Sequence, residues 1–215
     1  MTTLFRDSAI CPVCGTELFY SSIGSTNTFG SMDLDTRPPE MERSTISHWL
    51  IECHECGYVS VDMAKPALVD KSFLSQEGYK TCDGYDFISN LTEGFYRYHL
   101  INKANGNYKA AAFALIHAAW TCDDAQDAKA PELRAKAVEL LDSNPDDYNE
   151  GLYIMRADLL RRSFQYDKVI DDYENKAFSQ SLLNDIAKYQ VKLAREKDAG
   201  CYTVSSAVEY AKRLC

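Results

Sequence analysis

The sequence predicts an α+β protein, with a small β-domain at the amino terminus and an all-α domain of helical hairpins after it. Two Cys-x-x-Cys-Gly motifs, at residues 11–15 and 53–57, lie among short runs of β-branched and aromatic residues. From about Ile88 onward, apolar residues recur every three or four positions, as they do along one face of a helix. We therefore expect one domain over residues 1–87 and a second over residues 88–215.

The composition is typical of a folded, non-membrane protein. Of its 215 residues, 46% are hydrophobic and 26% are charged, enough for a core that needs no disulfides. The longest nearly apolar stretch, residues 110–120, is well short of the ~20 residues that span a bilayer. The first ten residues contain no apolar run of the kind found in secretory signals. We expect a cytoplasmic location and no association with membranes.

The eight cysteines fall into two groups. Four occur singly, and we expect them to be buried and inert because a reducing compartment leaves few disulfides. The other four form the two Cys-x-x-Cys-Gly motifs, and this spacing is typical of metal ligands. The single cysteines are Cys82, Cys122, Cys201 and Cys215, and the paired ones are Cys11, Cys14, Cys53 and Cys56.

The paired cysteines predict one structural zinc ion per chain. Two thiolates two residues apart can both face a tetrahedral ion, and the glycine after each pair lets the turn continue through a positive φ. Four sulfurs close the coordination shell and leave no position for water or substrate. The same ligands could hold iron in a rubredoxin-like site, and a thioredoxin-type dithiol is a third alternative. His54, between two ligands, is interpreted as an exposed loop residue.

Strands are expected around the cysteine pairs, at residues 16–22, 48–52 and 58–61. The 38 residues between Cys14 and Cys53 exceed the ~15–20 of a compact four-cysteine finger, so the predicted zinc ribbon carries an insertion. Within it, Asp33, Asp35 and Arg37 allow two interpretations. They form either a ligand or ion site, or an ion pair and a turn cap, and the second is favoured.

Seven helices are expected in the second domain. Residues 90–93 and 147–150 resemble capping boxes, Pro131 suits a first helical turn, and Gly200 separates the last two helices. The apolar faces are, in chain order: Leu91, Phe95 and Tyr98; Tyr108, Ala111, Ala112, Leu115, Ala119 and Cys122; Leu133, Ala137 and Leu140; Leu152, Met155 and Leu159; Val169, Ile170 and Tyr173; Leu182, Ile186, Tyr189 and Leu193; and Val204, Ala207, Ala211 and Leu214.

Two turns in this domain resemble those of tetratricopeptide hairpins, at residues 106–111 and 164–169. Their aromatic residues, Tyr108 and Tyr166, lie 58 positions apart instead of one period of ~34, so we expect a repeat-like domain rather than a tandem array.

The order of cysteine motif, acidic and prolyl segment at residues 33–39, second cysteine motif with Tyr58, and helical tail resembles a bacterial family of uncharacterised proteins. That family joins a split four-cysteine zinc ribbon to tetratricopeptide-like helices. The resemblance implies this architecture and a zinc site, and it implies no substrate. His54 departs from the proline often found there in the family, which affects only the stiffness of the turn.

Charge argues against nucleic-acid binding. Residues 1–88 carry six basic and 13 acidic side chains, and four thiolates around Zn²⁺ add about −2. Such a ribbon has few cations to replace the counterions of a phosphate backbone. The best basic cluster of the helical half, Arg156, Arg161 and Arg162, is small.

No enzymatic motif is evident. The chain has four histidines and lacks a Gly-rich phosphate loop, a His-Glu-x-x-His motif and a nucleophile elbow. His99 and His117 lie in helical patterns, where core or groove histidines are common, and Asp123-Asp124 and Asp146-Asp147 suit solvated turns or caps. An enzyme remains open, but a non-enzymatic role is favoured.

The remaining function is an interaction module. Stacked helical hairpins form a groove that can receive a protein or peptide partner. Trp120, Tyr148 and Tyr153 are candidate anchors if they are exposed, and core residues if they are not.

Overall fold

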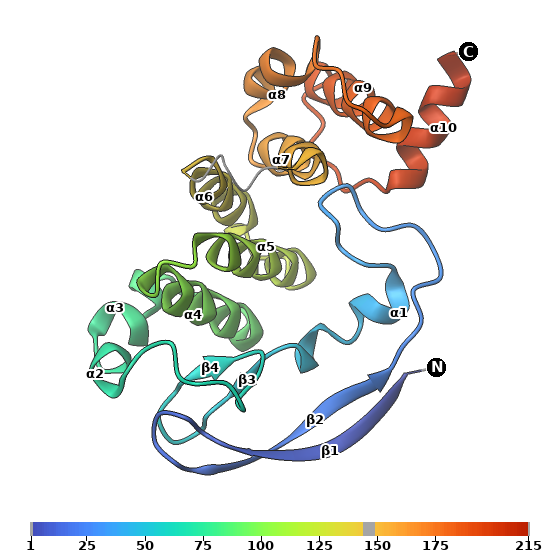
Figure 1. The fold of residues 1–215 in the computed structure, drawn as a ribbon. Coiled ribbons are helices and arrows are strands. Elements are labelled where there is room, and N and C mark those ends of the chain that lie inside the picture. The colour runs from blue at the N-terminus through green and yellow to red at the C-terminus, as the bar shows by residue number, and fades with distance from the viewer. Residues whose placement is uncertain (1, 144–148, 215) are drawn as a thin grey trace.

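The computed structural model describes residues 2–143 and 149–214. Two antiparallel hairpins form the amino-terminal part: β1 (Thr3–Ile10) pairs with β2 (Glu17–Ser25), and β3 (Ile51–Glu52) pairs with β4 (Val59–Ser60). Each Cys-x-x-Cys-Gly motif is the turn of one hairpin. In Figure 1 both hairpins lie at one end of the helical stack, and β1 and β2 form a long curved ribbon.

The strand β1 was not predicted. Its side chains are exposed at all but one position, so the sequence lacks the alternation that marks a half-buried strand. The expected strand over residues 16–22 is confirmed and continues to Ser25. The strand expected from residue 48 begins only at Ile51, because the 3-10 turn η1 (Ile46–His48) precedes it.

Other short elements lie between these parts. The helix α1 (Glu40–Arg43) lies between the two hairpins, and the second hairpin is followed by α2 (Lys71–Leu74), α3 (Glu77–Lys80) and η2 (Cys82–Gly84), which lead to the helical domain. Each is one turn long, and one turn is too short to produce a periodic pattern in a sequence. The sequence therefore gave no indication of them.

The predicted helical half is confirmed, and each expected helix has a counterpart. These are α4 (Asn90–Ala104), α5 (Tyr108–Asp124), α6 (Ala130–Asp142), α7 (Glu150–Arg162), α8 (Tyr166–Tyr173), α9 (Ser181–Arg195) and α10 (Val204–Leu214). Sequence neighbours pack against each other, and α7 also packs on α9. Figure 1 shows them stacked from α4 to α10, with the chain between β2 and α1 running beside the stack. Their likeness to tetratricopeptide hairpins stays a prediction.

The residues that cap the first turns of the helices can be compared with the predicted capping boxes. Ser89, one residue before the expected capping box, accepts a hydrogen bond from the Leu91 N–H and caps α4. Asn149 caps α7 through the Leu152 N–H. Asp146 and Asp147 lie outside the described residues. Pro131 occupies the first turn of α6, as predicted.

Two hydrophobic cores are present. The larger one joins α4 to α10, and it includes Leu34 and Ile46, which lie within the predicted amino-terminal domain. The smaller one surrounds the cysteine motifs and includes Ile101 of α4. The division between the cores therefore does not follow the expected boundary after residue 87.

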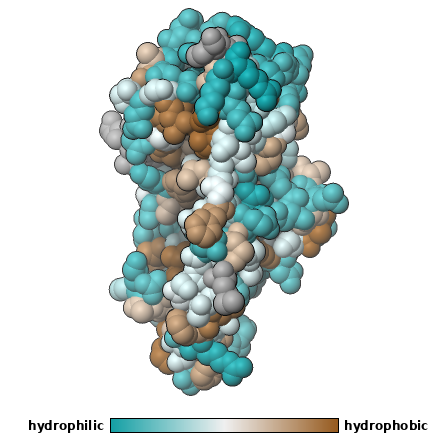
Figure 2. Space-filling model, turned by 90° about the vertical axis from the view of Figure 1, so that its right-hand side faces the viewer, coloured by the Kyte–Doolittle hydropathy of each residue, from teal (hydrophilic) through white to brown (hydrophobic). Residues whose placement is uncertain are grey.

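The surface mixes polar and apolar residues. On the face drawn in Figure 2, hydrophobic side chains occur in separate groups among hydrophilic ones. The most exposed large apolar side chains are Phe29, Phe19 and Ile88. Among the described helices, none combines the length and the apolar character needed to cross a bilayer.

Candidate functional site

The four paired cysteines meet at one point between the two hairpins. Their Sγ atoms all lie within 4.8 Å of one another. The Cys11 and Cys56 sulfurs are 3.7 Å apart, and those of Cys14 and Cys53 are 3.5 Å apart. These distances are far longer than the ~2.05 Å of a disulfide and close to the ~3.8 Å edge of a zinc–thiolate tetrahedron. The four sulfurs could therefore hold one metal ion.

The two motifs have the same backbone structure. The Gly15 N–H donates to the Cys11 carbonyl at 2.9 Å, and the Gly57 N–H donates to the Cys53 carbonyl at 2.8 Å. Gly15 and Gly57 have φ of 78° and 73°, a region that residues with a Cβ rarely adopt. The predicted role of both glycines is confirmed.

The thiols differ in their pKa values. Hydrogen bonds from the Thr16 hydroxyl and backbone lower the pKa of Cys14 to about 6, which favours the thiolate that binds metals. Burial raises the pKa of Cys53 and Cys56. A cation between the sulfurs would offset this burial and favour their thiolate forms.

Surrounding residues support the second cysteine pair. The Tyr79 hydroxyl on α3 donates to the Gly57 carbonyl at 2.6 Å, a contact with no signal in the sequence. His54 is exposed, as predicted.

Both cysteine pairs lie in strand-to-strand turns, whereas a thioredoxin-type dithiol begins a helix. The structure therefore does not support the dithiol alternative.

The insertion residues Asp33, Asp35 and Arg37 are buried and make contacts within the protein. Arg37 pairs with Asp124 at 2.5 Å, and Asp33 pairs with Arg43 at 2.7 Å. These contacts agree with the favoured structural interpretation of an ion pair. Asp123 and Asp124 lie at the carboxyl-terminal end of α5, as expected, and Asp124 is exposed. Both also form ion pairs, Asp123 with Arg162 and Asp124 with Arg37.

Asp35 is the centre of a buried polar network. Its Oδ2 accepts hydrogen bonds from the Trp120 indole at 2.8 Å and from Arg162 at 2.9 Å. The Arg134 guanidinium lies 3.8 Å away. Burial and the nearby Asp158 charge raise the pKa of Asp35, although Arg162 and Arg134 oppose this shift. The insertion is thereby joined to α5, α6 and α7.

The predicted aromatic anchors are not a group on the surface. Trp120 is only 3% exposed and belongs to the helical core, so the interpretation as an exposed anchor is wrong for it. Tyr153 is half-buried against Tyr173 and Phe178. Tyr148 lies outside the described residues.

The small basic cluster is buried too. Arg156 pairs with Asp142 and Asp172, Arg161 pairs with Asp158, and Arg162 pairs with Asp35 and Asp123. Guanidinium groups engaged in this way are not available to phosphates.

The single cysteines differ in their exposure, and both helical histidines are at least half-buried. Cys82 and Cys122 are buried, as predicted, whereas Cys201 is exposed and Cys215 lies outside the described residues. His99 is buried, and its Nδ1 lies 3.1 Å from the Ala111 carbonyl. His117 is half-buried in a groove of α5 that sequence reasoning did not find. Burial lowers the pKa of both histidines to about 4.

We compared the chain with protein-family models, curated proteins and solved structures. None of them matches it.

Proposed function

We propose that this protein is a non-enzymatic interaction module whose amino-terminal hairpins are held together by one structural zinc ion. The observation that carries the proposal is the cluster of four Sγ atoms within 4.8 Å. It supports a closed four-sulfur shell, which is typical of structural zinc and leaves no open position for catalysis.

The helical domain supports the interaction role. Its helices form a stack with a groove along α5, and stacked hairpins commonly present such surfaces to proteins or peptides. The ribbon then stabilises the end of the stack, since Ile101 of α4 packs in its core.

Elemental analysis of protein purified without added metal tests the metal assignment. We expect one equivalent of zinc and no visible colour. Iron together with a thiolate charge-transfer band would instead indicate the rubredoxin-like alternative.

The Cys56→Ser variant tests the structural role of the metal. Because metal-binding energy is folding energy in such sites, we expect loss of the metal and exposure of the residues around the cysteine pairs to hydrogen exchange. Cys201→Ser, a substitution of a cysteine outside the cluster, is the control and should keep both metal and protection. A Cys56→Ser protein that keeps its metal and its stability would contradict the assignment.

Affinity capture with the folded, metal-loaded chain tests the interaction role. We expect stoichiometric recovery of a protein partner. Failure to recover any partner under these conditions would contradict the role.

A further inference from the structure

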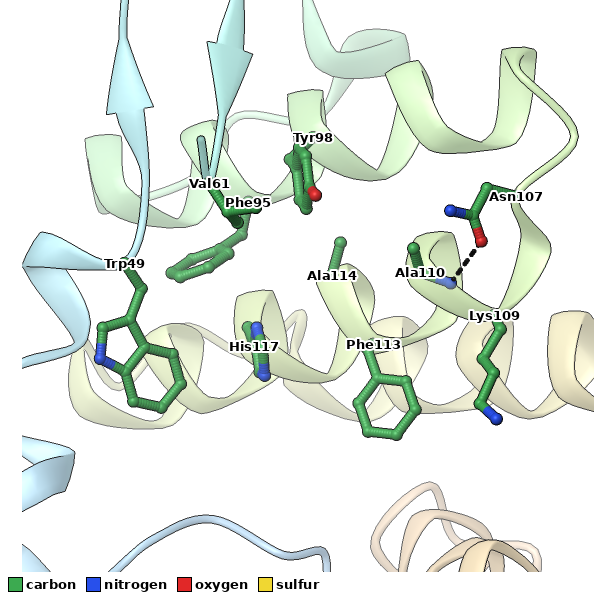
Figure 3. Close-up of a pocket in the computed structure, with 10 residues that line it drawn as sticks. All are labelled: Trp49, Val61, Phe95, Tyr98, Asn107, Lys109, Ala110, Phe113, Ala114 and His117. Atoms are coloured by element: carbon green, nitrogen blue, oxygen red, sulfur yellow. Dashed lines mark hydrogen bonds between the residues drawn. The ribbon is translucent and has the colours of Figure 1, made fainter. Parts of the chain in front are cut away.

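Two adjoining hollows form a groove along α5, which we call the α5 groove. The first has a volume of about 400 Å³ and the second about 450 Å³. Both are lined by Trp49, Phe113 and His117. Figure 3 shows Trp49 and Lys109 at opposite ends of the first hollow, with Phe113 and His117 between them.

The first hollow of the α5 groove is lined mainly by apolar side chains, the second also by polar residues such as Thr28 and Thr36, and both are open to solvent. Val61, at the rim of the groove, is 52% exposed. The helix that forms its floor rises about 16 Å from Lys109 to Trp120, which is the length of roughly five residues in an extended chain. An open groove of this length suits a peptide segment better than a small ligand, because small ligands are usually enclosed.

His117 is an unused hydrogen-bonding group in this groove. Its ring packs against Trp49, Phe95 and Trp120, with centroid distances of 5.3, 5.3 and 4.8 Å. Among the described residues, neither ring nitrogen has a hydrogen-bond partner. A neutral imidazole offers one donor and one acceptor, which match the carbonyl and N–H groups of a peptide backbone.

The two hollows carry opposite charges. Lys109 lines the first hollow and Glu42 lines the second. Within the described part of the chain, neither side chain forms an ion pair. An occupant with a carboxylate near Lys109 and a cation near Glu42 would therefore complement the groove.

We propose that the α5 groove binds an extended peptide segment of a protein partner, with an acidic residue at Lys109, apolar side chains over Phe113 and His117, and a basic residue at Glu42. This inference rests on the interaction role proposed above and adds the place and the chemistry of the partner. Apolar burial supplies affinity, and the end charges fix the direction of the segment.

Tryptophan fluorescence provides a direct test, because the chain contains only two tryptophans and both line the groove. The probes are a set of acetylated, amidated pentapeptides with Asp at one end, Arg at the other and three positions chosen from Leu, Phe, Val and Met. We expect saturable binding with dissociation constants of about 10 µM to 1 mM. If no member of the set binds, the proposal is wrong.

Two groove variants test the details. Lys109→Glu should weaken binding about fivefold and make peptides with Arg at both ends the better ligands. Val61→Asp should weaken all peptides about tenfold. Lys103→Glu makes the same charge change on an exposed residue outside both hollows, and it should leave affinity unchanged. If both groove variants bind the peptides with the same affinity as the wild type, the proposal is wrong.

The same variants separate this inference from the interaction role. A captured protein whose binding survives both Lys109→Glu and Val61→Asp would overturn the groove assignment and leave the interaction role standing.

Discussion

Asp35 lies in a polar segment of the sequence that suggests an exposed loop, but the structure buries it. It is fully buried, with Arg162 and Trp120 donating to the same carboxylate oxygen. A buried carboxylate costs free energy unless it is paired, and here the pairing joins an insertion to helices far along the chain. We therefore regard Asp35 as a structural residue of the helical domain.

Asp35→Asn should lower the free energy of unfolding by about 3 kcal/mol, because the neutral amide removes one of the two carboxylates that contact the buried guanidinium of Arg162. Urea unfolding followed by circular dichroism would measure the change. Glu174→Gln, which removes an exposed ion pair with Arg195, should cost less than about 1 kcal/mol. Equal effects of the two substitutions would show that the network contributes no more than a surface pair.

The sequence could predict the cluster of four cysteines but not this network. The four ligands lie in two short motifs whose turn geometry is local, so spacing alone indicates their chemistry. By contrast, Asp35 lies 85 residues from Trp120 and 127 from Arg162 in the sequence. No periodic pattern relates such positions. The α5 groove was missed for the same reason, since Trp49 and Val61 reach α5 from separate segments.

At the scale of elements, the two hairpin turns are the parts with the strictest backbone requirement. Gly57→Ala should destabilise the ribbon by about 1 kcal/mol, because φ is 73° there and an added Cβ would meet no atom within 4 Å, which leaves backbone strain as the cost. Chelator competition for the metal and urea unfolding would both report the change.

Gly151→Ala provides the matched control for this substitution. Gly151 lies in the first turn of α7, where alanine is the better helix former, so we expect a neutral or slightly stabilising effect of up to about 1 kcal/mol. A Gly57→Ala protein as stable as wild type would show that the turn tolerates another backbone conformation.

At the scale of the whole molecule, the helical domain is incomplete without part of the amino-terminal segment. Leu34 and Ile46 lie in the helical core, and Leu34 donates its N–H to the Tyr202 carbonyl at 2.9 Å just before α10. Asp33 forms an isolated antiparallel bridge with Thr203. The insertion thus connects the middle of the helical stack to its end.

A fragment of residues 88–215 should therefore retain helix content but lose cooperative packing. It lacks the apolar side chains of the insertion, so part of the helical core loses its packing partners. It also lacks the Asp35 carboxylate, so Arg134 and Arg162 each lose one nearby countercharge and keep Asp123. We expect binding of a hydrophobic dye and a broad urea transition. A longer fragment, residues 31–215, keeps the insertion and should unfold sharply even though it lacks the first cysteine pair. If the two fragments unfold with the same midpoint and steepness, the insertion is not part of the helical folding unit.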